Sequence, residues 1–303
     1  MKSDHGEGAQ TASLLWEAGA DLGEGALWDG RQQVLLWVDI NRKEVHRYDP
    51  ATGRDRKIVL DRKVGTVVPR RSGGLVVALE DRLCALNPDA GGPGHPVLTV
   101  LAAPEPDPGA DPAQLRFNDG KCDPRGRFWV GTMGEGAALY CLDTDGTCTR
   151  KLGGIRCSNG IAWNKARDTM YYIDSPTREI WAFPYDDGTG ALGEKRVIVQ
   201  VPEGYGVADG ATLDAEGMLW AAHWGGSRVC RWNPDTGALL REIHVPAAHV
   251  TSCAFGGENL ETLYITTARA GLSEEELREQ PLAGALFQVK PGVRGIPAYA
   301  YGG

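Results

Sequence analysis

The sequence predicts an all-β protein, a six-bladed β-propeller, on three observations. First, a strand–turn–strand unit recurs six times at intervals of roughly 40 to 50 residues, the period of four-stranded propeller blades. Second, each unit runs in the same order, from a polar strand through a turn to an apolar strand and then to a strand that leads into a second turn, which usually contains glycine. Third, the chain shows almost no helical periodicity.

Four copies of the unit are well preserved and two are degenerate. The preserved copies begin with GEGALWD (23–29), RFNDGKCD (116–123), SNGIAW (158–163) and ADGATLD (208–214). The degenerate copies begin with VGTVVP (64–69) and TSCAFG (251–256). Because the innermost strands of all blades surround one channel, we expect the first strands of these copies to meet at the centre of the molecule.

The two ends of the chain are expected to close the ring. Residues 11–16 (TASLLW) form a strand without a blade of its own, and the last copy lacks one strand. Pairing the two ends removes an unpaired edge. We therefore expect a single domain over residues 1–303, ordered from about residue 11, with residues 1–10 as a flexible tail.

One short surface helix is expected inside the last copy. Ser273 and Glu276 have the spacing of a capping box, and Pro281 ends the helix. The one compositional break is residues 91–114, which hold six of the 18 prolines. Long loops between blades are often lids. An active-site lid and a disordered insertion are equally open for this segment.

Composition excludes several classes of protein. The net charge is −8 and no block of Lys or Arg is present, which argues against a nucleic-acid partner. No apolar run approaches the ~18 residues that span a bilayer, and the N-terminus lacks the apolar core of a signal peptide. The seven cysteines have no CxxC spacing and are expected to be free thiols. We expect a cytoplasmic protein without a membrane partner, monomeric or a small homo-oligomer.

Aligning the preserved copies on their first turn selects candidate site residues. The turns begin at Asp29, Asp123, Asn164 and Asp214, and five residues earlier stand Glu24, Asn118, Asn159 and Asp209. Equivalent positions on inner strands converge in the channel. Desolvated carboxylates repel one another, and a divalent cation resolves this with carboxylate and amide oxygens as ligands. We expect one such cation; Ca, Zn, Mn and Mg are all open.

An alternative has to be weighed for two of these positions. Asn-Gly and Asp-Gly are common turn formers, so Asn159-Gly160 and Asp209-Gly210 could be ordinary turns. Polar side chains stand at the same offset from the first turn in four copies, however, and this recurrence favours a shared site over isolated turns. His223 follows an apolar strand and could approach the rim of the site, although a structural role is favoured.

The chain resembles the gluconolactonase/regucalcin-like (senescence marker protein) family of six-bladed propellers from about residue 14 to the C-terminus. The motifs that carry the resemblance include GEGALWD, RFNDGKCD, SNGIAW and ADGATLD, in this order. The resemblance implies one divalent metal held by Glu24, Asn159 and Asp209, with Arg116 and Asn118 binding substrate. Asp119 is interpreted as a turn residue or a group supporting the site.

One position departs from the family pattern. Members similar to regucalcin carry a substrate-contacting Glu at the third residue after GTM. Here GTM is residues 131–133 and that residue is Gly136; Glu135 is adjacent without being equivalent, and is a candidate for the rim of the site. The resemblance therefore implies the metal site more firmly than the identity of the substrate.

The resemblance implies metal-dependent hydrolysis of a sugar lactone, an aldono-lactone, to its aldonic acid. The cation would stabilise the charge that develops on the lactone, and Asp209 is the candidate base for water. Two alternatives are open: a calcium-binding regulatory propeller without turnover, and a hydrolase for an organophosphate or an acyl-homoserine lactone. Arg116 beside an acidic channel favours a substrate over a purely structural ion.

Overall fold

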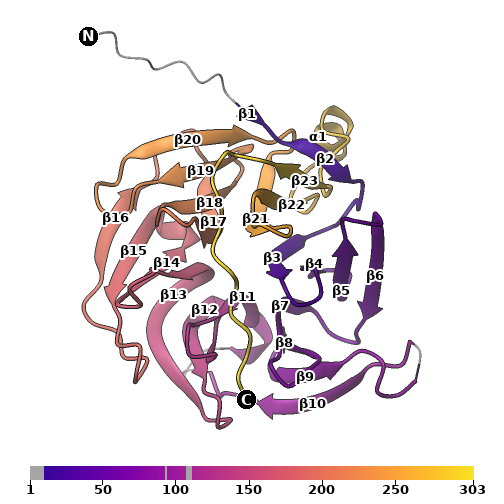
Figure 1. Ribbon diagram of the computed structural model, residues 1–303, viewed down its shortest axis with the longest axis vertical. Helices are drawn as coiled ribbons and strands as arrows, with labels where there is room; N and C mark the ends of the chain where they lie inside the picture. The colour runs from indigo at the N-terminus through magenta and orange to yellow at the C-terminus, as the bar shows by residue number, and fades with distance from the viewer. Residues whose placement is uncertain (1–9, 93, 107–110) are drawn as a thin grey trace.

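The chain forms four hydrogen-bonded sheets arranged radially about a common centre (Figure 1). The computed structural model describes residues 10–92, 94–106 and 111–303. Within these residues there are 23 strands, one α-helix and two short 3-10 helices. The prediction of an all-β protein is confirmed.

Two of the sheets have four strands each and follow the chain order. The first contains β3 (Gly23–Asp29), β4 (Val34–Asp39), β5 (Glu44–Asp49) and β6 (Arg54–Val59). The second contains β7 (Val64–Pro69), β8 (Leu75–Leu79), β9 (Leu83–Asn87) and β10 (Val97–Ala102). In both sheets the inner strand comes first and the outer strand last.

The other two sheets are larger. A six-stranded sheet contains β11 (Arg116–Cys122), β12 (Phe128–Leu142), β13 (Cys148–Trp163), β14 (Thr169–Asp174), β15 (Glu179–Pro184) and β16 (Arg196–Gln200). A nine-stranded sheet contains β1 (Gln10–Thr11), β2 (Ser13–Trp16), β17 (Val207–Leu213), β18 (Leu219–Trp224), β19 (Arg228–Trp232), β20 (Leu239–His244), β21 (His249–Gly256), β22 (Thr262–Ala268) and β23 (Leu286–Val289).

The ends of the chain meet in the nine-stranded sheet. Strand β2 is antiparallel to β23, with Ser13 opposite Gln288 and Leu14 opposite Phe287. The predicted pairing of the ends is confirmed. The predicted strand 11–16 is split, because β1 adds in parallel to β20 before the chain crosses to β23. The expected tail, except for residue 10, lies outside the described residues.

The predicted helix is present as α1 (Glu274–Glu279). Ser273 Oγ accepts from the backbone N–H of Glu276, and the Glu276 side chain accepts from the backbone N–H of Ser273. No helix in the described ranges is long and apolar enough to cross a membrane. All seven cysteines are free, as predicted.

Residues 91–114 are not one continuous loop between blades, so the expectation of a long loop was wrong for Val97–Ala102. Val97 to Ala102 form β10, paired antiparallel to β9 from Val97 opposite Asn87 onward. Pro112–Gln114 form a short 3-10 helix, η1, capped by the side chain of Asp111. Strand β10, with the apolar run VLTVLA, completes the second sheet as its outer strand, and the flanking prolines had favoured a loop in the sequence. Residues 93 and 107–110 lie outside the described part.

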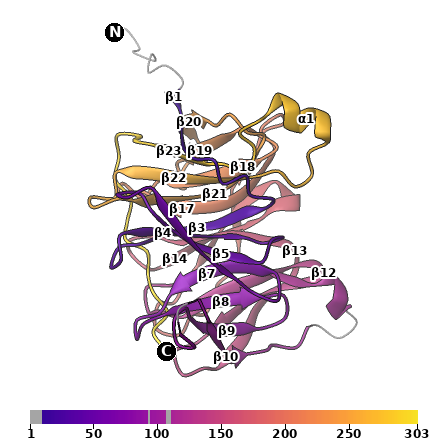
Figure 2. The same cartoon turned by 90° about the vertical axis from the view of Figure 1, so that its right-hand side faces the viewer.

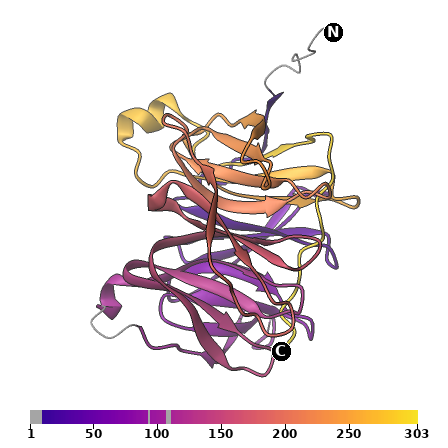
Figure 3. The same ribbon diagram turned by 90° about the vertical axis from the view of Figure 1, so that its left-hand side faces the viewer.

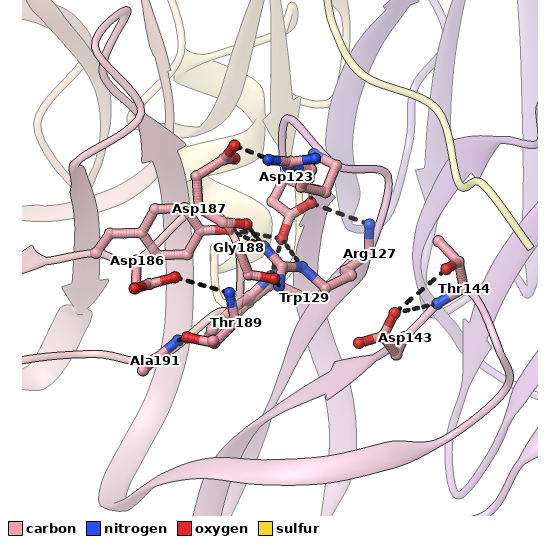
Figure 4. A network of polar contacts seen from close by, with 12 residues as sticks. Asp123, Arg127, Trp129, Asp143, Thr144, Asp186, Asp187, Gly188, Thr189 and Ala191 are labelled. Atoms are coloured by element: carbon pink, nitrogen blue, oxygen red, sulfur yellow. Dashed lines mark hydrogen bonds and ion pairs between the residues drawn. The ribbon is translucent and has the colours of Figure 1, made fainter.

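Two of the residues that begin the first turns, Asp123 and Asp214, hold their hairpins together. Asp123 is fully buried; its Oδ2 accepts from Arg127 Nε at 2.6 Å, Trp129 Nε1 at 2.8 Å and the Tyr185 hydroxyl at 2.7 Å (Figure 4). Asp214 repeats this arrangement, accepting from Trp220 Nε1 at 2.9 Å and Arg231 Nε at 2.8 Å. Each carboxylate thereby fixes a tryptophan of the second strand in the core.

A C-terminal segment, residues 290–303, crosses one face of the ring (Figure 1). The backbone N–H of Tyr301 donates to the carbonyl of Pro69, and the Tyr301 hydroxyl donates to the carbonyl of Asp143. Helix α1 lies on the opposite face (Figures 2 and 3). The segment therefore ties together sheets that are far apart in the sequence.

Candidate functional site

Irregular strand register marks the site in every inner hairpin. Register shifts occur at 24–27, 64–66, 117–120, 159–161, 208–211 and 250–252. A bulge bends a strand and changes the direction of its side chains. The candidate residues Glu24 and Asn159 begin two of these shifts, and Asn118 and Asp209 lie inside two others. Their side chains therefore come from strands that are locally distorted at equivalent places.

The two amides of the candidate set are in direct contact. Asn118 Nδ2 donates to Asn159 Oδ1 and to the carbonyl of Ser158, both at 2.9 Å. Asn159 Nδ2 in turn donates to Ser175 Oγ at 2.7 Å. Strands β11 and β13 are thus joined at the channel, and both amides are at least nine-tenths buried.

The two carboxylates of the set are buried and influence each other. Burial, and then the charge of Asp119, raise the pKa of Glu24 to about 8, although the Gly25 N–H and Arg116 oppose this. Burial and the charge of Glu24 raise the pKa of Asp209 well above its usual range. Asp209 Oδ1 has no hydrogen-bond partner among the described residues. Arg116 and the nearby backbone N–H groups therefore do not fully compensate the burial and mutual repulsion of these carboxylates in their ionised form.

The Asn-Gly and Asp-Gly steps are not turns. Asn159-Gly160 lies within β13, and Asp209-Gly210 lies within β17. A Cβ on Gly160 would stand 2.7 Å from the carbonyl oxygen of Asp209, and a Cβ on Gly210 would stand 2.5 Å from Ser252 Oγ. These glycines let neighbouring inner strands approach closely, so the turn interpretation is wrong.

Arg116 joins the acidic cluster to the surface. Its Nη1 donates to Asn118 Oδ1 at 2.7 Å and to the carbonyl of Phe117 at 3.0 Å. Burial lowers the pKa of Arg116, while the charges of Glu24, Asp209 and Glu80 are among those that oppose the shift. The guanidinium is therefore the principal positive charge facing these acids, held in place by Asn118.

Arg116 also lines an open cavity, which we call the vestibule. Its volume is about 580 Å³. Its lining consists of Arg62, Lys63, Glu80, Asp81, residues 112–116 and Met133. The vestibule gives a ligand access to the guanidinium from the side of η1 and β8.

The three peripheral candidates differ in position. Asp119 is buried; its Oδ1 accepts from the Gly120 N–H, and burial raises its pKa. His223 is fully buried and hydrogen-bonded through Nδ1 to the carbonyl of Tyr205; burial lowers its pKa to about 4. Glu135 is exposed on β12. Asp119 thus adds to the acidic cluster, His223 is a neutral core residue and Glu135 faces solvent.

The sequence reasoning missed three residues that support the site. Cys157 Sγ lies 3.5 Å from Asn159 Nδ2, and burial raises the pKa of this thiol to about 12, so it stays protonated. Ser175 Oγ donates to the carbonyl of Ala208. Lys121 Nζ donates to the carbonyl of Ala211. Only Lys121 had a sequence signal, because it belongs to the RFNDGK motif.

The donor set suits a hard divalent cation. Two carboxylates, Glu24 and Asp209, and the amide of Asn159 could supply oxygen ligands, and Asp209 Oδ1 has no donor among the described residues. The described residues hold no group of three His, Cys, Asp or Glu side chains placed to bind a metal. A cation here would therefore need the amide as well as the two acids.

Comparison with known proteins identifies the family. The family described as SMP-30/Gluconolactonase/LRE-like region matches residues 22–269. Regucalcin of Danio rerio is 38% identical over 291 residues, covering 93% of this chain and 95% of its own. YvrE of Bacillus subtilis, named as a candidate sugar lactone lactonase, is 38% identical over 299 residues, covering 96% and 99%.

A solved structure agrees with these relatives. Regucalcin from Agrobacterium tumefaciens, described as a calcium-binding protein, superimposes with a TM-score of 0.89 at 28% identity and covers 97% of this chain and 98% of its own. The chain belongs to the SMP-30/gluconolactonase/LRE-like family.

Proposed function

We propose that this protein hydrolyses sugar lactones to aldonic acids with the help of one divalent cation. The observation that carries the proposal is the buried acidic cluster, with its unpartnered Asp209 oxygen, directly beside the Arg116 guanidinium. A cation site alone needs no guanidinium, whereas the fixed fork of donors on Arg116 suits the oxygens of a lactone. The name of the Bacillus subtilis relative, a candidate sugar lactone lactonase, supports the same reaction.

Glu24, Asn159 and Asp209 would hold the cation, which when bound supplies positive charge to stabilise the negative charge that develops on the lactone oxygen. Arg116 and Asn118 would hold sugar hydroxyls, since the guanidinium presents donors in a fixed fork. Asn118 in turn fixes the orientation of Arg116 through the 2.7 Å hydrogen bond.

Asp209 is the proposed base. It would accept a proton from water as the water oxygen bonds to the lactone carbonyl carbon. The bond from that carbon to the ring oxygen then breaks, and the ring oxygen takes up a proton to become a hydroxyl group.

We also propose that the ring consists of six blades in a single domain. Six inner hairpins carry the same register irregularity. The nine-stranded sheet would divide between β18 and β21, where a single residue pair, Trp224 and His249, links them. The six-stranded sheet would divide within the long strands β12 and β13.

A second candidate function is calcium binding without turnover. It is supported by the description of the Agrobacterium tumefaciens relative as a calcium-binding protein and by the same acidic cluster. The two functions differ in whether Arg116 and the vestibule are used.

The deciding experiment is a pH-indicator assay over pentono- and hexono-lactones, with an organophosphate and an acyl-homoserine lactone as comparison substrates. The protein is assayed after chelation and after return of Ca, Zn, Mn or Mg. We expect sugar-lactone hydrolysis that is lost on chelation and restored by at least one metal. Activity that survives thorough chelation would contradict cation dependence, and metal binding without any hydrolysis would favour the second function.

A further inference from the structure

Glu80 is a free acid in the vestibule. Its carboxylate makes no hydrogen bond or ion pair with the described residues, yet its charge acts on Arg116. Its backbone is fixed, because the Phe117 N–H donates to the Glu80 carbonyl at 3.1 Å. Glu80 is thus held against the strand that carries Arg116 and Asn118, with its acceptor oxygens available to a ligand.

The neighbouring acid, Asp81, differs from Glu80 because its carboxylate has partners in the protein. Asp81 also lines the vestibule, but its two oxygens accept from Arg82 at 2.8 and 2.7 Å. Arg62 Nη1 donates to the same carboxylate at 3.4 Å. Two consecutive acids therefore differ: Asp81 is satisfied by the protein and Glu80 is not.

Lys63 provides a free donor in the same cavity. It lines the vestibule next to Arg62, and no ion pair or hydrogen bond of its ammonium group occurs within the described ranges. The vestibule therefore presents one acceptor and one donor, beyond Arg116, whose side chains have no partner in the described part of the chain. The lining holds three cationic and two anionic side chains, so it carries both signs of charge and only a small excess of positive charge. A neutral polyhydroxylated group can use both signs, because its hydroxyls can donate to Glu80 and accept from Lys63.

We propose that the vestibule is a subsite for a second sugar ring, bound by Glu80 and Lys63, and that the substrates are glycosylated aldono-lactones. The inference rests on the proposed lactonase function. A volume of about 580 Å³ falls within the ~300–1,000 Å³ of pockets that enclose drug-sized ligands, more than one lactone ring requires. Arg116, shared by both spaces, holds the lactone ring while Glu80 and Lys63 hold the attached sugar.

The test compares kcat/KM for cellobiono-1,5-lactone and glucono-1,5-lactone, corrected for spontaneous hydrolysis. The wild-type protein should prefer the disaccharide lactone. Glu80→Ala should lower kcat/KM for cellobionolactone about tenfold, mainly through KM, and leave gluconolactone within twofold. Glu80→Gln, which keeps one acceptor oxygen, should lie between the two. The matched control Asp81→Asn should leave the ratio unchanged, and thermal melting checks that each variant is folded.

Three results would overturn the inference. They are a wild type without preference, a Glu80→Ala variant that affects both lactones equally or neither, and an Asp81→Asn variant with the same effect as Glu80→Ala. In each of these cases gluconolactone hydrolysis continues, so the proposed function stands. If neither lactone is hydrolysed, the proposed function is wrong, and the inference, which rests on it, is wrong as well.

Discussion

Two buried turn acids, Asp123 and Asp214, differ from the buried channel acid Asp209 in how their oxygens are used. Asp29, the turn acid of the first hairpin, stands outside this comparison, because its Oδ2 also has no partner among the described residues. In the turns, Asp123 accepts five hydrogen bonds and Asp214 accepts four. In the channel, Asp209 Oδ1 accepts none from the described residues. All three carboxylates are at least 96% buried.

The comparison shows that burial alone does not identify a functional acid. A buried carboxylate with all its acceptor sites filled is part of the structure, since the protein has already compensated its desolvation. A buried carboxylate with an empty acceptor site and a raised pKa needs a partner from outside. Replacing a satisfied turn acid such as Asp123 should therefore lower stability and spare activity. Replacing the channel acid Asp209 should lower activity and spare stability.

The largest effect is expected from Asp209→Asn. The change removes the proposed base and one carboxylate ligand, so kcat should fall by roughly 10²–10⁴-fold or more. Thermal stability should be preserved or increased, because one buried negative charge is gone. Lactone assays together with thermal melting test both parts. A variant with near-normal kcat would refute the role of Asp209.

Asp123→Ala should show the opposite pattern. It leaves the buried Arg127 guanidinium without its ion pair, and breaking a buried pair costs about 3–5 kcal/mol. Denaturant titration should show that loss in the free energy of unfolding, while kcat at 25 °C stays near that of wild type. A large fall in kcat with unchanged stability would show that Asp123 is a functional acid. It would contradict the proposed difference between turn acids and channel acids.

The smallest expected effect is on the pH dependence of stability. The pKa of Glu24 rises from 4.5 to about 8 on folding without a cation, so the folded chain keeps a proton that the unfolded chain releases. The melting temperature of chelated protein should therefore fall by a few degrees between pH 5 and pH 8. Added Ca²⁺ should stabilise more at pH 8 than at pH 5, because the ion competes with protons.

Glu24→Gln is the control for that measurement. It cannot ionise, so the melting temperature of the chelated variant should depend less on pH, and added Ca²⁺ should stabilise it less. An unchanged pH profile in this variant would mean that other groups cause the wild-type dependence.

Much of the fold could be predicted because its signals are local. The turn residues, the apolar second strands and the capping box at Ser273 each lie within a few residues, and the repeat multiplied them. Strand β10 was missed because its pattern is short and lies between prolines. The pairing of β2 with β23 was predicted from the count of strands, not from any property of the residues themselves.

Part of the candidate site could also be predicted, because its signals are local and repeated. The five-residue offset selected Asn118 and Asn159, which are in contact. Ser175 could not be found, because it follows β14 and reaches Asn159 only through the packing of neighbouring strands. Glu80 belongs to a degenerate copy with no motif, and only the cavity that it lines distinguishes it from Asp81.

The joining of the two chain ends has a consequence for folding kinetics. The hydrogen bond from Ser13 Oγ to the Gln288 carbonyl connects residues 275 apart in sequence. Contacts of such separation carry a large loop-closure cost and slow the folding reaction. During synthesis, β2 leaves the ribosome first but has to wait for β23 before it can pair. Until β23 is available, the strands on either side of the future β2–β23 pairing expose unpaired edges. The nascent chain is therefore most prone to aggregate in the interval before the ring closes.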